Sequence, residues 1–212
     1  MTALTDLDTP VVTVDLDIMR DNIRRVQAHL SRYGIGNRPH IKTHKIPEIG
    51  KMQMAAGATG ITCQKLGEVE VFVDAGVTDD ILLTFNILGE LKTDRLMTLV
   101  KRVRRLAVVL DNDVVAQALS DAAARHGVDL SFLVECDTGF GRTGVQTPDE
   151  AFALARRAMR MPRMRFDGLM TFPNRDPNTR DFFEAALALF KQAGIPVPVV
   201  SGGGTPSLFT AQ

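Results

Sequence analysis

The sequence predicts an α/β protein whose parallel strands form a (β/α)8 barrel of the TIM type. Short runs rich in Val, Ile, Leu and Thr recur along the chain, and longer amphipathic segments separate them. This strand-then-helix unit repeats at intervals of roughly 20 to 30 residues, which indicates βα units and a parallel sheet. About seven or eight such units favour a barrel. The alternative is a flavodoxin-like or Rossmann sheet, which usually needs fewer strands.

Eight runs have the composition of strands that are covered on both faces, because aliphatic and β-branched residues dominate them. In chain order they are Pro10–Val14, Arg38–Lys42, Thr59–Gln64, Asp80–Phe85, Arg105–Leu110, Asp129–Cys136, Phe166–Phe172 and Val197–Ser201.

Helical segments lie between these runs. Leu16–Arg32 places apolar residues at helical spacing, and Gly76 suits the end of a helix. Thr147 followed by Pro148 and two acids is typical of a helix start. The other expected helices are Gly67–Ala75, Lys92–Arg102, Asp113–Arg125, Asp149–Arg160 and Arg180–Gln192.

Composition excludes several classes of protein. The 212 residues carry 25 basic and 25 acidic side chains, so a basic nucleic-acid footprint is not expected. No apolar run has the length of a membrane span, and no secretory signal is visible at the N-terminus. Two cysteines do not form a disulfide framework, and they lack zinc-ligand spacing. We therefore expect a cytoplasmic protein without a metal site of its own.

The segment Arg38–Lys45, RPHIKTHK, is the sharpest chemical signal. If it is a strand, period-two alternation places His40, Lys42 and His44 on one face, with His44 at the carboxyl mouth of the barrel. A lysine between imidazoles and apolar walls favours the neutral amine that a Schiff base requires. The alternative is a solvated basic strand end.

Two loops could hold an anionic ligand. Ser201, Gly202, Gly203, Gly204 and Thr205 follow a late strand, where barrels commonly bind phosphate through backbone N–H groups. A tight glycine turn without a ligand is the alternative.

The second loop follows the run that ends at Cys136, and it carries Arg142 between glycines. The planar guanidinium of Arg142 could bind an anionic oxygen. Glu135 and Asp137 could form a paired-carboxylate site, although holding Arg142 or capping the loop is the simpler role.

Together these segments resemble a known family. The motifs RPHIKTHK, CQKLGEVEVFVDAGVTDDILL, VECDTGFGRTGV, GLMTF and SGGGTP are similar to those of the D-threonine aldolase and D-serine dehydratase group. That group belongs to the alanine-racemase-like, fold-type III enzymes that use pyridoxal 5'-phosphate. The resemblance extends from Thr9 to Pro206.

The resemblance implies roles for particular residues. Lys42 would form the Schiff base with pyridoxal 5'-phosphate, and Arg142 would lie near the phenolic oxygen of the cofactor. Ser201 to Thr205 would bind the phosphate. His40, His44 or the freed Lys42 would transfer protons. Phe172 stands where related sequences often have tyrosine.

The implied activity is a lyase reaction on β-hydroxy-D-amino acids, in which a D-threonine-type substrate is cleaved to glycine and an aldehyde. Three alternatives stay open: a D-serine dehydratase, an amino-acid racemase, and a barrel that binds the cofactor without turnover. Relatives place residues of a second subunit near the site, which implies a homodimer.

The resemblance also implies that residues 1–212 form one cofactor-binding barrel domain without its last strand. Members of the group carry a C-terminal β-domain that supplies a divalent metal site, Mn or Zn, and this chain contains no counterpart. In such relatives the run that corresponds to Pro10–Val14 joins the β-domain.

Overall fold

The computed structural model describes residues 3–210 of the chain. Helices and strands alternate along most of its length. The strands are β1 (Ile61–Cys63), β2 (Asp80–Leu83), β3 (Arg105–Leu110), β4 (Leu130–Glu135), β5 (Met164–Met170) and β6 (Val199–Ser201). The helices are α1 (Leu16–Arg32), α2 (Pro47–Ala55), α3 (Leu66–Asp74), α4 (Glu90–Val100), α5 (Asp113–His126), α6 (Pro148–Ala158) and α7 (Asn178–Gln192). Three 3-10 turns cover Leu4–Asp6, Ile41–Thr43 and Thr205–Thr210.

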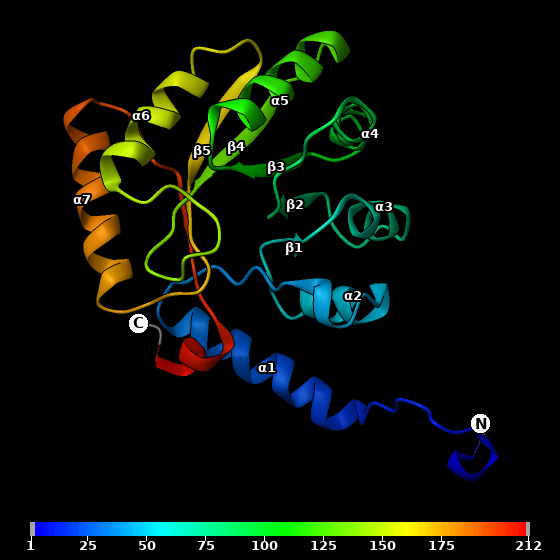
Figure 1. The fold of residues 1–212 in the computed structure, drawn as a ribbon. Helices are drawn as coiled ribbons and strands as arrows, with labels where there is room; N and C mark the ends of the chain where they lie inside the picture. The colour runs from blue at the N-terminus through cyan, green and yellow to red at the C-terminus, as the bar shows by residue number, and fades with distance from the viewer. Residues whose placement is uncertain (1–2, 211–212) are drawn as a thin grey trace.

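The six strands form one parallel sheet in the order β1-β2-β3-β4-β5-β6. A doubly wound sheet reverses its strand order at a switch point, whereas a barrel adds each strand beside the previous one. The observed order therefore confirms the barrel class and excludes the Rossmann alternative. Figure 1 shows the sheet curling, with helices α2 to α7 around its outside.

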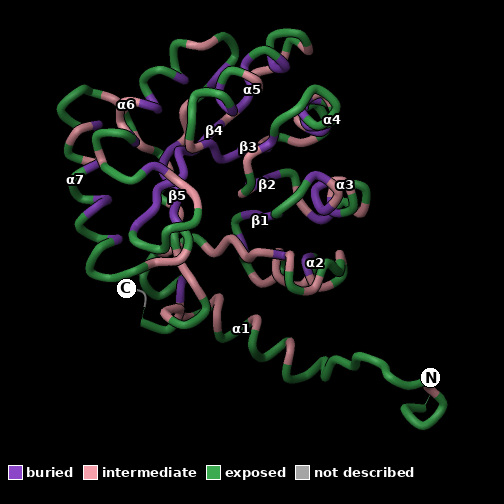
Figure 2. The backbone as a smooth tube through the Cα atoms, viewed as in Figure 1, coloured by how far each residue is buried: buried purple, intermediate pink, exposed green. Residues whose placement is uncertain are grey.

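The core lies on both faces of this curled sheet, and the two parts differ in size. Most buried side chains pack between the strands and the surrounding helices. A smaller cluster inside the curl contains Leu82, Ala107, Val109, Leu133 and Met170. Figure 2 shows the buried residues along the strands and on the helix faces turned toward them. Alternation along each strand explains this division, because successive side chains point to opposite faces.

An ionic cluster, which we call the floor cluster, occupies the amino ends of the strands inside the curl. Asp80 at the start of β2 pairs with Arg38 and Arg105, each at 2.9 Å. Arg105 at the start of β3 also pairs with Asp167 of β5. The floor cluster thus joins strands at the end of the barrel opposite the carboxyl mouth.

Several helix ends agree with the sequence prediction. Thr147 and Glu150 form a reciprocal capping box at the start of α6. Gly127 caps the end of α5 by donating its N–H to the carbonyls of the last turn, and Gly76 follows the end of α3. None of the helices within residues 3–210 has the length and apolar character needed to cross a membrane.

Two expected strands are wrong. Pro10–Val14 pairs with no strand among residues 3–210, and Val12 is 93% exposed. A β-rich run forms a strand only beside a partner strand. Arg38–Lys42 makes one parallel bridge, from His40 to Thr62, and then enters a 3-10 turn. His40 Nδ1 accepts the Lys42 N–H at 3.3 Å, and this local bond competes with a ladder.

Two other segments differ from the prediction. Helix α2 begins directly at Pro47, in a stretch for which the sequence analysis predicted no element. Thr205–Thr210 forms a 3-10 turn that packs on α1, where the Phe209 and His29 rings are 5.3 Å apart. The described residues therefore form a half-barrel of six strands, where eight runs were expected.

Candidate active site

The predicted site residues come from loops that follow the carboxyl ends of the strands. Lys42 lies two residues beyond the bridge that His40 makes beside β1. Its Nζ lies 5.2 Å from the centre of the Phe172 ring, which follows β5. Five strand spacings separate these positions around the sheet, about 24 Å if the sheet were flat. The curl of the sheet is what brings Lys42 and Phe172 together.

Arg142 reaches the same aromatic ring from a third loop. Its Cζ lies 5.4 Å from the centre of the Phe172 ring, so the ring contacts two cations. The half-barrel thus brings Lys42 and Arg142 to one place, as expected of residues that act on a common ligand.

The loop that carries Arg142 is held by Asp137. The Asp137 carboxylate accepts N–H groups from Gly139, Phe140 and Gly141 at 2.7–2.9 Å. Burial disfavours the charged form of Asp137, but these bonds outweigh it and hold its pKa below the usual value. A side chain at Gly144 would place its Cβ 2.6 Å from the Asp137 nitrogen. Asp137 therefore caps the loop, which is one of the roles expected for it.

Glu135 is the last residue of β4 and lies beside this loop. It is buried, and burial raises the pKa of its carboxyl group. The Thr143 hydroxyl donates to its Oε1 at 2.7 Å, and Arg142 lies 4.0 Å from the same oxygen. Glu135 and Asp137 accordingly serve different partners, rather than forming a paired-carboxylate site.

His40 is an uncharged neighbour of Lys42. Burial first, and then the positive charge of Lys42, lower the pKa of His40 to about 4. Its Nδ1 accepts the Lys42 N–H, so the proton of the neutral ring is on Nε2. At neutral pH His40 therefore adds no positive charge beside the lysine.

His44 does not share a face with His40 and Lys42, because the 3-10 turn breaks the expected alternation. Its ring lies 6.2 Å from that of Phe72 on α3, and its Nδ1 accepts the Ile46 N–H at 3.0 Å. Burial lowers the pKa of His44. These contacts place it among the helices, and its proposed proton transfer stays a prediction.

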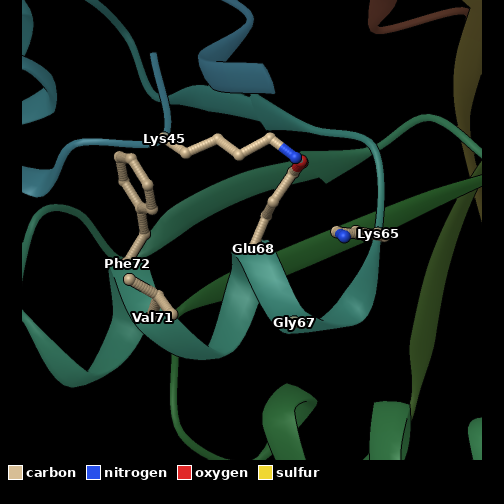
Figure 3. A pocket seen from close by; sticks show the side chains of 6 residues that line it. All are labelled: Lys45, Lys65, Gly67, Glu68, Val71 and Phe72. Carbon is tan, nitrogen blue, oxygen red and sulfur yellow. The ribbon is translucent and has the colours of Figure 1, made fainter. Parts of the chain in front are cut away.

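An ion pair between the exposed Lys45 and the buried Glu68 lies beside the turn that carries Lys42. Lys45 adopts a left-handed backbone with φ 54°, which is strained for a residue with a side chain. Its Nζ lies 3.2 Å from Oε1 of Glu68, and the Gln64 N–H donates to Oε2 at 2.7 Å. Figure 3 shows the Lys45 side chain extended toward Glu68 across a pocket on α3. Neither Lys45 nor Glu68 is a candidate site residue from the sequence pattern alone.

The glycine loop after β6 faces the segment after β5. Asn174 Oδ1 accepts the Gly203 N–H at 2.8 Å, and a Cβ at Gly202 would lie 2.7 Å from the same oxygen. Within residues 3–210, the N–H groups of Gly202 and Gly204 have no acceptor. The loop therefore presents free backbone donors, as the phosphate prediction requires.

Three buried threonines join the loops around the mouth, and the sequence analysis did not single them out. The Thr138 hydroxyl lies 3.2 Å from that of Thr171 and 2.9 Å from that of Thr179. Because Thr138 follows β4, Thr171 follows β5 and Thr179 lies in the first turn of α7, only the folded structure reveals the contact. Across the part of the chain that the structure describes, no cluster of three or more His, Cys, Asp or Glu side chains could hold a metal ion.

Comparisons with known proteins place the chain in a family with this fold. Residues 14–212 match the family described as the N-terminal domain of alanine racemase. The D-threonine aldolase of an Arthrobacter species is 35% identical over 96% of this chain and 57% of its own length. The 3-hydroxy-D-aspartate aldolase of Paracoccus denitrificans is 33% identical over 96% of this chain and 56% of its own.

The crystal structure of D-threonine aldolase from Filomicrobium marinum superposes with a TM-score of 0.91 at 32% identity. The superposition includes 97% of this chain and 59% of the aldolase chain. The chain thus spans little more than half the length of these relatives. From the half-barrel, the grouped loops and these matches together, the chain belongs to the alanine racemase N-terminal domain family.

Proposed function

We propose that this chain binds pyridoxal 5'-phosphate through Lys42 and forms the barrel part of a lyase that acts on β-hydroxy-D-amino acids. The observation that carries the proposal is the convergence of Lys42 and Arg142 on one aromatic ring at the carboxyl mouth. Barrel enzymes place their chemistry at this end. A relative named D-threonine aldolase supports the reaction class.

The residues present fit such a cofactor. Free N–H donors of the glycine loop suit a phosphate, and the missing side chain at Gly202 lets the loop lie close against Asn174. Ser201 and Thr205 border these donors with hydroxyl groups. The exposed guanidinium of Arg142 can bind the ring oxygen of the cofactor. When bound, the cofactor supplies an electron sink for the bonds at the substrate Cα.

Neighbouring side chains prepare Lys42 for this task. His40 stays neutral, so it does not add a second charge beside the Lys42 amine. The Lys45–Glu68 pair holds the end of the turn that carries Lys42. As a free amine, Lys42 could accept or return a proton at the mouth, whereas the ring N–H of His40 is already engaged by the Thr62 backbone.

The preferred reaction is the retro-aldol cleavage of a D-threonine-type substrate to glycine and an aldehyde. A dehydratase reaction is the second candidate, because a D-threo-3-hydroxyaspartate dehydratase of Delftia is 33% identical over 98% of this chain. Racemisation and binding without turnover complete the alternatives. A divalent metal, Mn or Zn, is expected only where a longer protein supplies the ligands. A homodimer and a cytoplasmic location stay predictions.

The test begins with the purified chain and pyridoxal phosphate. We expect a visible absorption band that Lys42→Ala abolishes and Lys51→Ala, on α2, retains. D-threonine or D-serine is then added with Mn²⁺ or Zn²⁺, and the products are identified. Glycine with acetaldehyde supports the aldolase, and pyruvate or 2-oxobutyrate with ammonia supports the dehydratase. A band that persists in Lys42→Ala contradicts the proposed site.

A further inference from the structure

Three cations and two aromatic rings alternate along the carboxyl mouth of the half-barrel. Phe172 lies between Lys42 and Arg142, as described above. The Arg142 Cζ also lies 5.7 Å from the centre of the Phe140 ring, and that centre is 5.2 Å from the Arg175 Cζ. We call these five residues the cation–aromatic ladder. Each contact is within the range of a cation–π interaction.

The cation–aromatic ladder holds more positive charge than its surroundings neutralise. Among the three cations, Arg142 alone has a carboxylate of residues 3–210 within 4.0 Å, and that group is Glu135. In the described part of the chain, Lys42 and Arg175 have no ion-pair partner. Aromatic faces attract cations but carry no net charge. The mouth is therefore suited to ligands with more than one anionic group.

Arg175 combines a fixed backbone with an available guanidinium. Its N–H donates to Thr179 Oγ1 at 2.6 Å, and its carbonyl accepts the Thr179 N–H at 2.9 Å. The Arg175 residue is exposed, and its guanidinium has no hydrogen-bond acceptor within residues 3–210. The backbone is thus held while the charged group is free to bind, which lowers the entropy lost on binding.

We propose that Arg175 binds a carboxylate on the side chain of the substrate. The inference rests on the proposed function, and it narrows the substrates to β-hydroxy-D-amino acids with an acidic side chain. In that function Lys42, Arg142 and the glycine loop each have a partner on the cofactor, which leaves Arg175 as the cation without one. Its planar fork matches a carboxylate with two parallel hydrogen bonds.

The phosphate of the cofactor is the other possible source of anionic oxygen. Arg175 follows Asn174, which holds Gly203 of the glycine loop. If Arg175 bound the phosphate, replacing it would weaken the binding of pyridoxal phosphate more than the binding of pyridoxal. If it serves the substrate, the ratio of these two affinities stays unchanged, so the two sources can be told apart.

The test compares D-aspartate with its neutral isostere D-asparagine on the chain loaded with pyridoxal phosphate. Neither compound has a β-hydroxyl group, so binding is measured from the change of the visible band without cleavage. We expect the native chain to prefer D-aspartate by about tenfold or more, the value of one good charged hydrogen bond. Arg175→Gln should reduce the preference to within about twofold, and Arg175→Lys should restore part of it.

Arg180→Gln is the matched control, because Arg180 is an exposed arginine of α7 that contacts no aromatic ring among the described residues. It should retain the preference, which separates direct contact from the general field of the mouth. The proposal is overturned if Arg175→Gln retains the preference for D-aspartate. It is also overturned if Arg175→Gln weakens the binding of pyridoxal phosphate more than the binding of pyridoxal.

A cofactor-free measurement separates this inference from the proposed function. Calorimetric titration of the cofactor-free chain compares its affinity for succinate with that for the monoamide, succinamate. This comparison measures the same preference for a second carboxylate. If pyridoxal phosphate gives no visible band, the proposed function fails, and the calorimetry still decides about Arg175. A weaker succinate affinity in Arg175→Gln alone supports the anion site, and equal affinities in all variants reject it.

Discussion

Asp80→Asn tests the floor cluster, which holds the amino ends of the strands together. The Asp80 side chain is 12% exposed, and those of Arg38 and Arg105 are 19% exposed. Burial disfavours the charged carboxylate, but Arg38 and Arg105 outweigh this effect and hold the pKa of Asp80 below its usual value. The amide keeps the shape and removes the charge, so Arg38 loses its carboxylate while Arg105 keeps Asp167.

Breaking a buried ion pair costs about 3–5 kcal/mol. Because the arginines are partly exposed and Asp167 remains, we expect Asp80→Asn to lower the free energy of unfolding by about 2–4 kcal/mol. Urea unfolding at pH 7 measures this loss. The slope of the unfolding free energy against urea concentration should stay unchanged, because a changed slope would indicate a different unfolded state. The control Asp113→Asn breaks the exposed pair with Arg157 and should cost at most about 1 kcal/mol. Equal losses in the two variants would refute a stabilising floor cluster.

Three further changes test individual contacts. The pKa of His40 lies near 4 in the folded chain and near 6.5 when unfolded, so the stability from its neutral form is complete above pH 6.5 and declines as the pH falls toward 4. Since the ring is partly exposed, the native chain should lose about 1–2 kcal/mol more than His40→Gln between pH 7 and 4.5 in urea titrations. Gly202→Ala brings a Cβ against Asn174 and should weaken pyridoxal phosphate about tenfold by absorbance titration, whereas Gly67→Ala, without close contacts, should not. Thr138→Val removes two buried hydroxyl contacts and should cost about 1–3 kcal/mol by urea unfolding; a loss no larger than that of the exposed Thr98→Val would contradict this.

Elements with a strong local signal could be predicted from the sequence. Leu16–Arg32 and Arg105–Leu110 have the predicted bounds, because apolar spacing and β-branched composition are local properties. The capping box at Thr147 follows from four adjacent residues. The strand order was predictable too, since each βα unit adds its strand beside the previous one.

Contacts across the sheet could not be predicted in this way. The turn at Ile41–Thr43 depends on one side-chain bond from His40, which overrides the strand pattern. The contact between Lys42 and Phe172 depends on the curl of the whole sheet. Lys42 and Arg142 were found through motifs, whereas Arg175 has no local signal and becomes visible only beside Phe140.

Trapping with borohydride tests directly whether Lys42 carries the cofactor at the carboxyl mouth. The chain is incubated with pyridoxal phosphate, reduced with borohydride and digested, and the modified peptide is sequenced by mass spectrometry. Predominant modification of Lys42, at one equivalent per chain, is the predicted result. Modification mainly of Lys45 or Lys65 on the neighbouring pocket, or spread evenly over all lysines, would contradict the claim.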